Sequence, residues 1–175
     1  MVNGHRLIAI LLIGLGSIGI SVTSAAIADS TTPQKVAFVG FRIINEAMEP
    51  VSEAEKKRAK LLDLIFVVQL QKTGQFELVP LQKAIAEEID KRPFIGECNG
   101  CEIDYGKNVG VDLSAWGTIQ TVSNLILNLN VYMESIQSRQ LTYIKSIDIR
   151  GNNDRSWTKG LEWMLKYYML GQDKE

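Results

Sequence analysis

The hydrophobic pattern changes its period near residue 114, and this change strongly limits how the chain can fold. Before it, apolar residues recur at helical spacing in segments 52–72 and 81–89, and short apolar runs stand at 36–41 and 76–79. After it, the pattern alternates, and five apolar residues fall on one face of a predicted strand: Leu125, Leu127, Leu129, Val131 and Met133. Strands at 114–121 and 141–149, with a hairpin loop at 134–139, complete a predicted antiparallel meander.

This order of elements predicts an α/β (α+β) fold with a mixed sheet of about five strands. A βαβ unit comes first, a short helical stretch at 105–109 follows the second helix, and the meander leads into a C-terminal helix at 156–170. The helices are expected mainly on one face of the sheet. Residues 29–175 are expected to form one domain, since no linker or internal repeat divides them.

Two helix starts carry local signals. Ser52 and Glu55 have the spacing of a capping box, in which each side chain satisfies a free backbone N–H of the other residue. Asp154 or Ser156 is expected to cap the last helix, ahead of Trp157 in its buried stripe. The apolar second half of the first helix, 61–68, is expected to be buried under the sheet.

The first 28 residues have the three parts of a secretory signal peptide. Arg6 supplies the positive charge, an uncharged apolar segment follows from Leu7, and Ala26-Ile27-Ala28 is an A-x-A cleavage pattern. This predicts export to the periplasm, cleavage after Ala28 and no membrane segment afterwards. The alternative is an uncleaved anchor, because residues 7–28 contain no charge and are long enough to span a bilayer.

Composition argues against several classes of function. Nineteen Lys and Arg against twenty Asp and Glu give a net charge of −1, without the basic excess of a nucleic-acid-binding protein. The one histidine, His5, lies in the predicted signal peptide, so the exported chain has none for a catalytic triad, a general base or a metal ligand. No G-x-S-x-G or phosphate-binding loop follows in the exported chain. These features favour a binding protein without a cofactor or metal over an enzyme.

Cys98 and Cys101 form the one C-x-x-C motif of the chain. In an oxidising compartment the two cysteines are expected to form a disulfide that staples a loop. Glu102 stands where a haem attachment motif needs histidine, and with Glu97 it places negative charge that disfavours a reactive thiolate. A thiol–disulfide redox pair remains an alternative, as does a metal site shared between molecules, since zinc requires four ligands.

The last helix has a second apolar stripe beside its core face. Residues of the core face recur at helical spacing: Trp157, Leu161, Met164, Leu165 and Tyr168. The neighbouring stripe holds Gly160, Trp163, Tyr167 and Leu170, and its aromatic side chains are of the kind that dominates the energetics of protein interfaces. We therefore expect an interaction site there, the alternative being that the C-terminal tail or another helix covers the stripe.

Four short sequences in order carry a resemblance: VAFVGF, LQKTGQFELVP, GKNVGVDLSAWGTI and RGNNDRSWTKG. Together they resemble an uncharacterised family of secreted bacterial proteins, similar in pattern to the N-terminal α/β domain of TolB and to CsgG, over residues 35–170. The resemblance implies a fold and a periplasmic setting but no catalytic residues. It also implies alcohol-oxidation systems as partners of some relatives.

The resulting hypothesis is a non-enzymatic accessory protein that docks on another periplasmic protein or complex. Two alternatives stay open. One is a thiol–disulfide redox protein that uses Cys98 and Cys101, and the other is a small-ligand-binding domain with a cleft at the ends of its strands.

Overall fold

The structure is a computed structural model that describes residues 32–46, 50–91 and 98–170. The chain divides into two units, residues 1–30 and 31–175, and the described residues belong to the second. The predicted signal peptide and its cleavage site therefore lie outside the described residues. No helix in the described ranges has both the length and the apolar character needed to cross a membrane.

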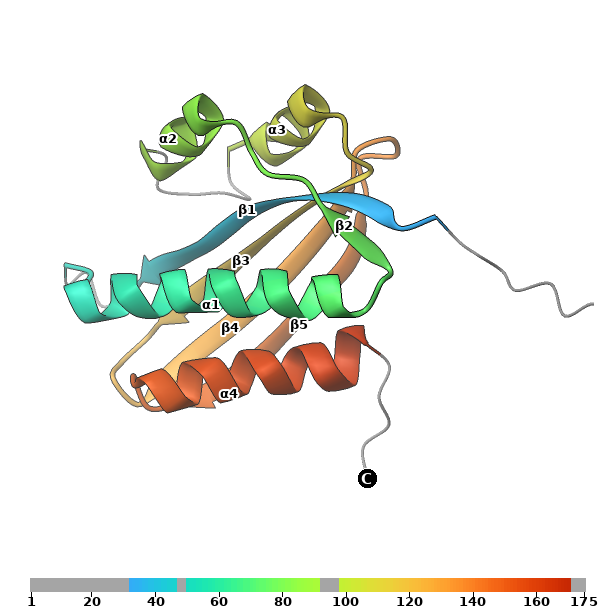
Figure 1. Cartoon of the computed structure of the whole chain (residues 1–175). Helices are drawn as coiled ribbons and strands as arrows, with labels where there is room; N and C mark the ends of the chain where they lie inside the picture. The colour runs from blue at the N-terminus through green and yellow to red at the C-terminus, as the bar shows by residue number, and fades with distance from the viewer. Residues whose placement is uncertain (1–31, 47–49, 92–97, 171–175) are drawn as a thin grey trace, which may run out of the picture. The chain divides into compact units, whose positions relative to one another are not determined.

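Five strands form one sheet in the order β2-β1-β3-β4-β5 (Figure 1). The second strand in this order, β1 (Gln34–Asn45), runs parallel to both β2 (Phe76–Leu78) and β3 (Leu113–Thr121). The meander continues antiparallel through β4 (Ile126–Ser135) to β5 (Leu141–Arg150). The prediction of a mixed five-stranded sheet is confirmed. The first strand is longer than the apolar run at 36–41 from which it was predicted.

The two longer helices pack on one face of the sheet. The large core lies between this face and helices α1 (Glu53–Lys72) and α4 (Asp154–Met164), the latter continuing as the π-helical turn η1 (Leu165–Met169). The short helices α2 (Lys83–Lys91) and α3 (Cys101–Val109) pack a smaller core on the other face, around Trp116. Parallel strands need such crossover helices, so the placement follows from the strand order.

The alternating residues of β4 form the centre of the large core. Leu127, Leu129, Val131 and Met133 are all at most 3% exposed. Leu125 is the exception and is 73% exposed, because the strand begins one residue later and Leu125 lies in the preceding turn. The period-2 prediction therefore holds wherever the segment pairs with β3.

The helix caps match the sequence signals only in part. Ser52 and Glu55 form the predicted capping box, with the Ser52 N–H donating to the Glu55 carboxylate at 2.8 Å. The cap of α4 is Asn153, whose side chain accepts from the Ser156 N–H at 3.0 Å, so the expectation of Asp154 or Ser156 was wrong. Asn153 has the extended backbone of an N-cap, whereas Asp154 is already helical.

The second half of α1 is less buried than its composition suggested. Leu62, Phe66 and Leu70 face the core at 0% exposure, but Leu64 is 66% exposed and Val68 is 45% exposed. A run of apolar residues on a helix wraps around the whole cylinder, so a single sheet face can bury only part of it. The expectation that the whole segment 61–68 is buried was therefore wrong.

One close approach at the sheet centre leads to a test of the packing. A Cβ atom added at Gly117 in β3 would overlap the ring of Phe41, which is itself 2% exposed. Gly117→Ala should lower the free energy of unfolding by about 1–3 kcal/mol, because an overpacked core has to shift. Chemical denaturation measures this change. In a Phe41→Leu background the same substitution should cost less, and an equal cost in both backgrounds would contradict the contact.

Candidate functional site

Trp163 lies over a groove between β5 and α4. We call it the Trp163 groove, and its volume is about 450 Å³. Its lining comes from both elements: Ile147, Asp148, Ile149, Arg150, Ser156, Lys159, Gly160 and Trp163. The indole is 41% exposed. Gly160 packs so closely on the Ile149 side chain that a larger residue would have to displace it, and this brings α4 down onto β5.

The other residues of the predicted stripe lie beside Trp163 but are partly buried. The ring of Trp163 is 5.6 Å from that of Tyr167 and 5.1 Å from that of Tyr168, measured between centroids. Tyr167 and Leu170 are both of intermediate exposure. The helix widens to a π-turn from Leu165, so residues after that point no longer follow the rotation of 100° per residue used to predict the stripe.

Sequence reasoning missed the β5 side of this groove. Ile147 of β5 lines the groove, and Gly160, predicted only as part of the stripe, lies against β5. A glycine inside an amphipathic helix is itself a signal of close backbone packing. Lys145, the polar residue on the inner face of β5, places its ammonium 3.6 Å from the centroid of the Tyr168 ring. Cation–π attraction therefore accounts for its position.

Burial also affects a neighbouring tyrosine of β5. Burial, and secondarily the nearby Tyr168, raise the pKa of Tyr143 to about 12. The phenol therefore stays neutral at physiological pH.

The rim of the groove carries an ion pair in which Lys159 Nζ lies 2.7 Å from Glu162 Oε2. The groove thus has an apolar floor and a charged rim, the usual arrangement of a protein-binding patch.

Cys98 and Cys101 form a disulfide that leads directly into α3. Their Cα atoms are 5.5 Å apart, and the turn between them holds Asn99 and Gly100 with positive φ angles of 59° and 95°. The helix begins at Cys101, earlier than the predicted stretch at 105–109. Cys101 is 7% exposed and packs against Trp116 in the smaller core, so the disulfide fixes this end of α3 on the sheet.

A buried carboxylate lies against this disulfide. Glu102 is 5% exposed, and one of its oxygens lies 3.1 Å from Cys98 Sγ. The start of a helix favours a thiolate by about 0.3–1 kcal/mol. Unit charges about 4 Å apart repel by about 4 kcal/mol at an effective dielectric constant of about 20. The carboxylate therefore outweighs the helix terminus, and the site disfavours a reactive thiolate.

Glu102 also bears on metal binding and on a second carboxyl group. The two sulfurs and a Glu102 oxygen lie within 4.8 Å of one another, but sulfurs joined in a disulfide are not thiolate ligands. Burial, and then the charge of Glu102, raise the pKa of Glu134 on the adjoining strand β4. The Glu102 and Glu134 carboxylates therefore repel each other, while Arg139 acts on Glu134 in the opposite direction.

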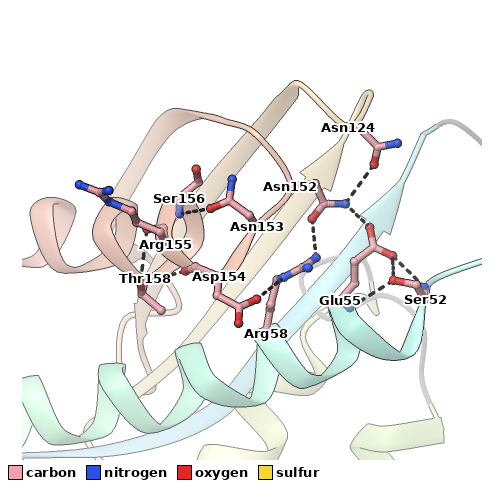
Figure 2. Close-up of polar contacts among 10 residues, drawn as sticks. All are labelled: Ser52, Glu55, Arg58, Asn124, Asn152, Asn153, Asp154, Arg155, Ser156 and Thr158. Atoms are coloured by element: carbon pink, nitrogen blue, oxygen red, sulfur yellow. Dashed lines mark hydrogen bonds and ion pairs between the residues drawn. The ribbon is translucent and has the colours of Figure 1, made fainter.

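A polar pocket lies at the carboxyl ends of β1 and β3, where the small-ligand alternative expects a cleft. Its volume is about 320 Å³, and its polar lining includes Asn45, Ser52, Glu55, Thr121, Ser123, Asn124 and Asn152. Figure 2 shows that several of these side chains bond to one another. Asn152 donates to Glu55 at 2.8 Å and to Asn124 at 3.3 Å, and it accepts from Arg58 at 2.9 Å.

These contacts join α1 to the start of α4 and to the β3–β4 turn. Arg58 continues the network by donating to Asp154 at 2.7 Å (Figure 2). The sequence indicated only a turn at 151–154, and the convergence of Asn152 on Glu55 depends on tertiary structure. Most hydrogen-bonding groups of Glu55, Arg58 and Asn152 are bonded within this network, which favours a structural role. We call the network of Glu55, Arg58, Asn124, Asn152 and Asp154 the clamp.

Hydrogen bonding controls the charge of Glu55. Burial by itself raises the pKa of this carboxyl, but bonds from the Ser52 side chain and backbone and from Asn152 outweigh it. The net result is a pKa below the ordinary value of 4.5. Glu55 therefore stays ionised in the folded protein and holds the capping box and the clamp together.

The disulfide can be tested by removing it. A double Cys98→Ser, Cys101→Ser variant should lose about 1–3 kcal/mol of unfolding free energy, because so short a loop gains little from the cross-link. The wild-type protein should not catalyse the reduction of insulin by dithiothreitol. Catalytic turnover, or a thiol pKa in the reduced protein well below about 8.5, would instead support the redox alternative.

The clamp predicts a pH dependence of stability. A lowered folded pKa means that Glu55 stabilises the fold fully above its unfolded value of about 4.5, and this contribution disappears as pH falls through the folded pKa. Glu55→Gln should cost about 1 kcal/mol near neutral pH. Denaturation curves of the two proteins should converge in acid. A constant difference at every pH would show that Glu55 acts through packing instead of charge.

Two solved structures share the fold at low sequence identity. The C-terminal domain of LpoB from Salmonella enterica is 14% identical, with 70% of this chain and 87% of that chain covered and a TM-score of 0.50. The lipoprotein GNA1162 from Neisseria meningitidis is 11% identical, with coverage of 78% and 96% and a TM-score of 0.51. At these identities the likeness establishes the architecture alone.

The expected likeness to TolB is weaker. The TolB structure from Acinetobacter baumannii is 11% identical, covers 77% of this chain and 28% of that chain, and gives a TM-score of 0.39, too low to support an argument. The CsgG part of the resemblance stays a prediction. A search of curated proteins gives no significant match.

A family model matches most of the chain. The family, DUF3280, carries the description "Protein of unknown function (DUF2380)", and its model covers residues 34–169. The match runs from the start of β1 to the end of η1 and so includes every described helix and strand. The chain therefore belongs to this family, as the resemblance to an uncharacterised family predicted.

Proposed function

We propose that the protein is a non-enzymatic accessory protein of the periplasm that docks on another periplasmic protein through the Trp163 groove. The observation that carries the proposal is the 41% exposure of Trp163 over an apolar groove. A tryptophan that remains this exposed loses hydrophobic stabilisation, and a partner that covers it recovers that energy. Tryptophan is also among the residues that contribute most energy at protein interfaces.

The surroundings of the groove support a protein partner over a small molecule. β5 is the last strand of the sheet, and its outer edge has no strand neighbour among the described residues. Two further apolar side chains are exposed on this strand, Leu141 at 49% and Ile144 at 61%, and their pairing with Glu134 and Tyr132 places them on the sheet face opposite the groove. The combination of an aromatic residue, an apolar floor and an open edge offers an extended surface instead of an enclosed cavity.

The proposed location rests on the predicted signal peptide and on the disulfide, which is typical of exported proteins. A fold shared with the lipoprotein GNA1162 is compatible with the cell envelope. The geometry gives less support to the two alternatives. Glu102 opposes a reactive thiolate at Cys98, and the polar pocket at the strand ends holds a network that is satisfied internally.

The proposal predicts that Trp163→Ala abolishes co-purification of the partner and leaves the fold intact. The protein is isolated from periplasm under mild conditions, and co-eluting proteins are identified by mass spectrometry. The melting temperature should change by no more than about 4 °C, because the indole is far from fully buried. Leu125→Ala removes a more exposed apolar side chain in a turn and should retain the partner.

Two results would contradict the proposal. One is a partner that co-purifies equally with wild-type protein and the Trp163→Ala variant. The other is a destabilisation of about 3–5 kcal/mol, the cost of truncating a core aromatic residue, which would make Trp163 part of the interior.

A further inference from the structure

The outer edge of β1 is open along most of its length. β2 has three residues and pairs with β1 only at Gln34, Lys35 and Val36. Beyond that point β1 continues for nine residues to Asn45, paired with β3 on its inner side. No described residue forms a strand on the outer side of this stretch. Such an edge is a template for a further strand.

A bulge between Phe38 and Phe41 determines which backbone groups face this edge. After the bulge, the Phe41 N–H donates to the Asp63 side chain at 2.7 Å, on the side away from β3. The Glu46 N–H donates to the Thr121 carbonyl, so even-numbered residues face β3. Because backbone direction alternates along a strand, the N–H and C=O of Ile43 point outward, with no hydrogen bond to another described residue.

A groove of about 750 Å³ lies between this edge and α1. We call it the β1 groove, and it is lined by Phe41, Arg42, Ile43, Val51, Lys56, Lys57, Ala59, Lys60, Leu61 and Leu64. Four of these ten residues are cationic, and no carboxylate is among the described residues of the lining. Two acids beside the groove pair with two of the cations, Glu53 with Lys56 at 2.7 Å and Asp63 with Lys60 at 3.9 Å, so the cations remain in excess. The protein as a whole has a slight negative charge, so this positive patch is a local feature.

The α1 wall of the groove is apolar as well as basic. Leu61 is 39% exposed and Leu64 is 66% exposed, and Val68 extends the same stripe one turn further at 45%. These residues are spaced three and four apart, so they share one face of the helix. Every second side chain of an added strand would face α1. Those near Phe41 would meet Leu61 and Leu64, and those nearer Asn45 would meet the lysines of the first two turns of α1.

We propose that the β1 groove binds an extended, acidic peptide segment of a partner protein, which adds as a strand to the edge at Phe41–Asn45. The open backbone groups of Ile43 supply main-chain hydrogen bonds, Leu61 and Leu64 receive apolar side chains, and the cations receive Asp or Glu. The site is separate from the Trp163 groove, because β1 and β5 border opposite sides of the sheet. It does not depend on the function proposed above.

The test is a display library of random peptides of about eight residues, selected on the protein purified after expression of the full-length sequence. Enriched peptides should have apolar residues at every second position toward the Leu64 end and Asp or Glu at every second position toward the Lys56 end, and they should lack proline at the centre. Their affinity should fall by at least about tenfold for Leu64→Glu, which puts a negative charge in the groove. Leu125→Glu, at a comparably exposed leucine outside the groove, should leave the affinity unchanged.

Ile43→Pro tests the backbone contact, since it removes an edge-facing N–H and no bond to β3. A folded Ile43→Pro variant should also lose binding by at least about tenfold, and Trp163→Ala should retain it. The proposal is overturned if no peptide is enriched, if the peptides are basic or have helical spacing, or if Leu64→Glu binds them as wild type does. Loss of binding in Trp163→Ala would move the peptide to the other groove. A wild-type dimer that Leu64→Glu dissociates would identify a second copy of the chain as the occupant.

Discussion

The packing of α1 and α4 against one face of the sheet is the interaction on which the rest of the structure depends. Leu62 and Phe66 from α1 and Trp157 and Leu161 from α4 are fully buried there, against the alternating residues of β4. Arg58 and Asn152 then tie the two helices together at one end. Two helices side by side cover the middle of a five-stranded sheet but not its borders. The β1 groove and the Trp163 groove lie where this helix layer ends, one beside β1 and the other beside β5.

Much of the fold could be predicted because its signals are local. The alternation from Leu127 to Met133 requires only that one face of a strand be buried, and the capping box of Ser52 and Glu55 is formed within a single turn. The exposure of Leu64 and Val68 to solvent could not be predicted in this way. Which apolar residues of α1 face the sheet depends on the angle at which the helix crosses it, and the sequence of the helix alone does not encode that angle.

The candidate site was predictable to the same extent. Trp163 was identified from the helical wheel because the helix is regular up to Met164, whereas the π-turn changes the direction of Tyr167 and Leu170. The approach of Glu102 to Cys98 could be inferred from sequence proximity. The meeting of Asn152 with Glu55 could not, since the two residues are 97 positions apart and converge only when α4 packs beside α1. The open edge of β1 could not be inferred from the sequence either, because it results from the short pairing of β2 with β1.

The central claim is that this domain acts by holding a protein against the edge of its sheet beside α4. Site-specific photo-crosslinking in living cells tests it most directly, with a photoreactive amino acid at Lys159 on the rim of the Trp163 groove and, as a control, at Lys72 at the end of α1. The account predicts one discrete protein adduct from position 159, none from position 72, and loss of the adduct when Trp163→Ala is added. The absence of an adduct at position 159, or the same adduct from both positions, would contradict it.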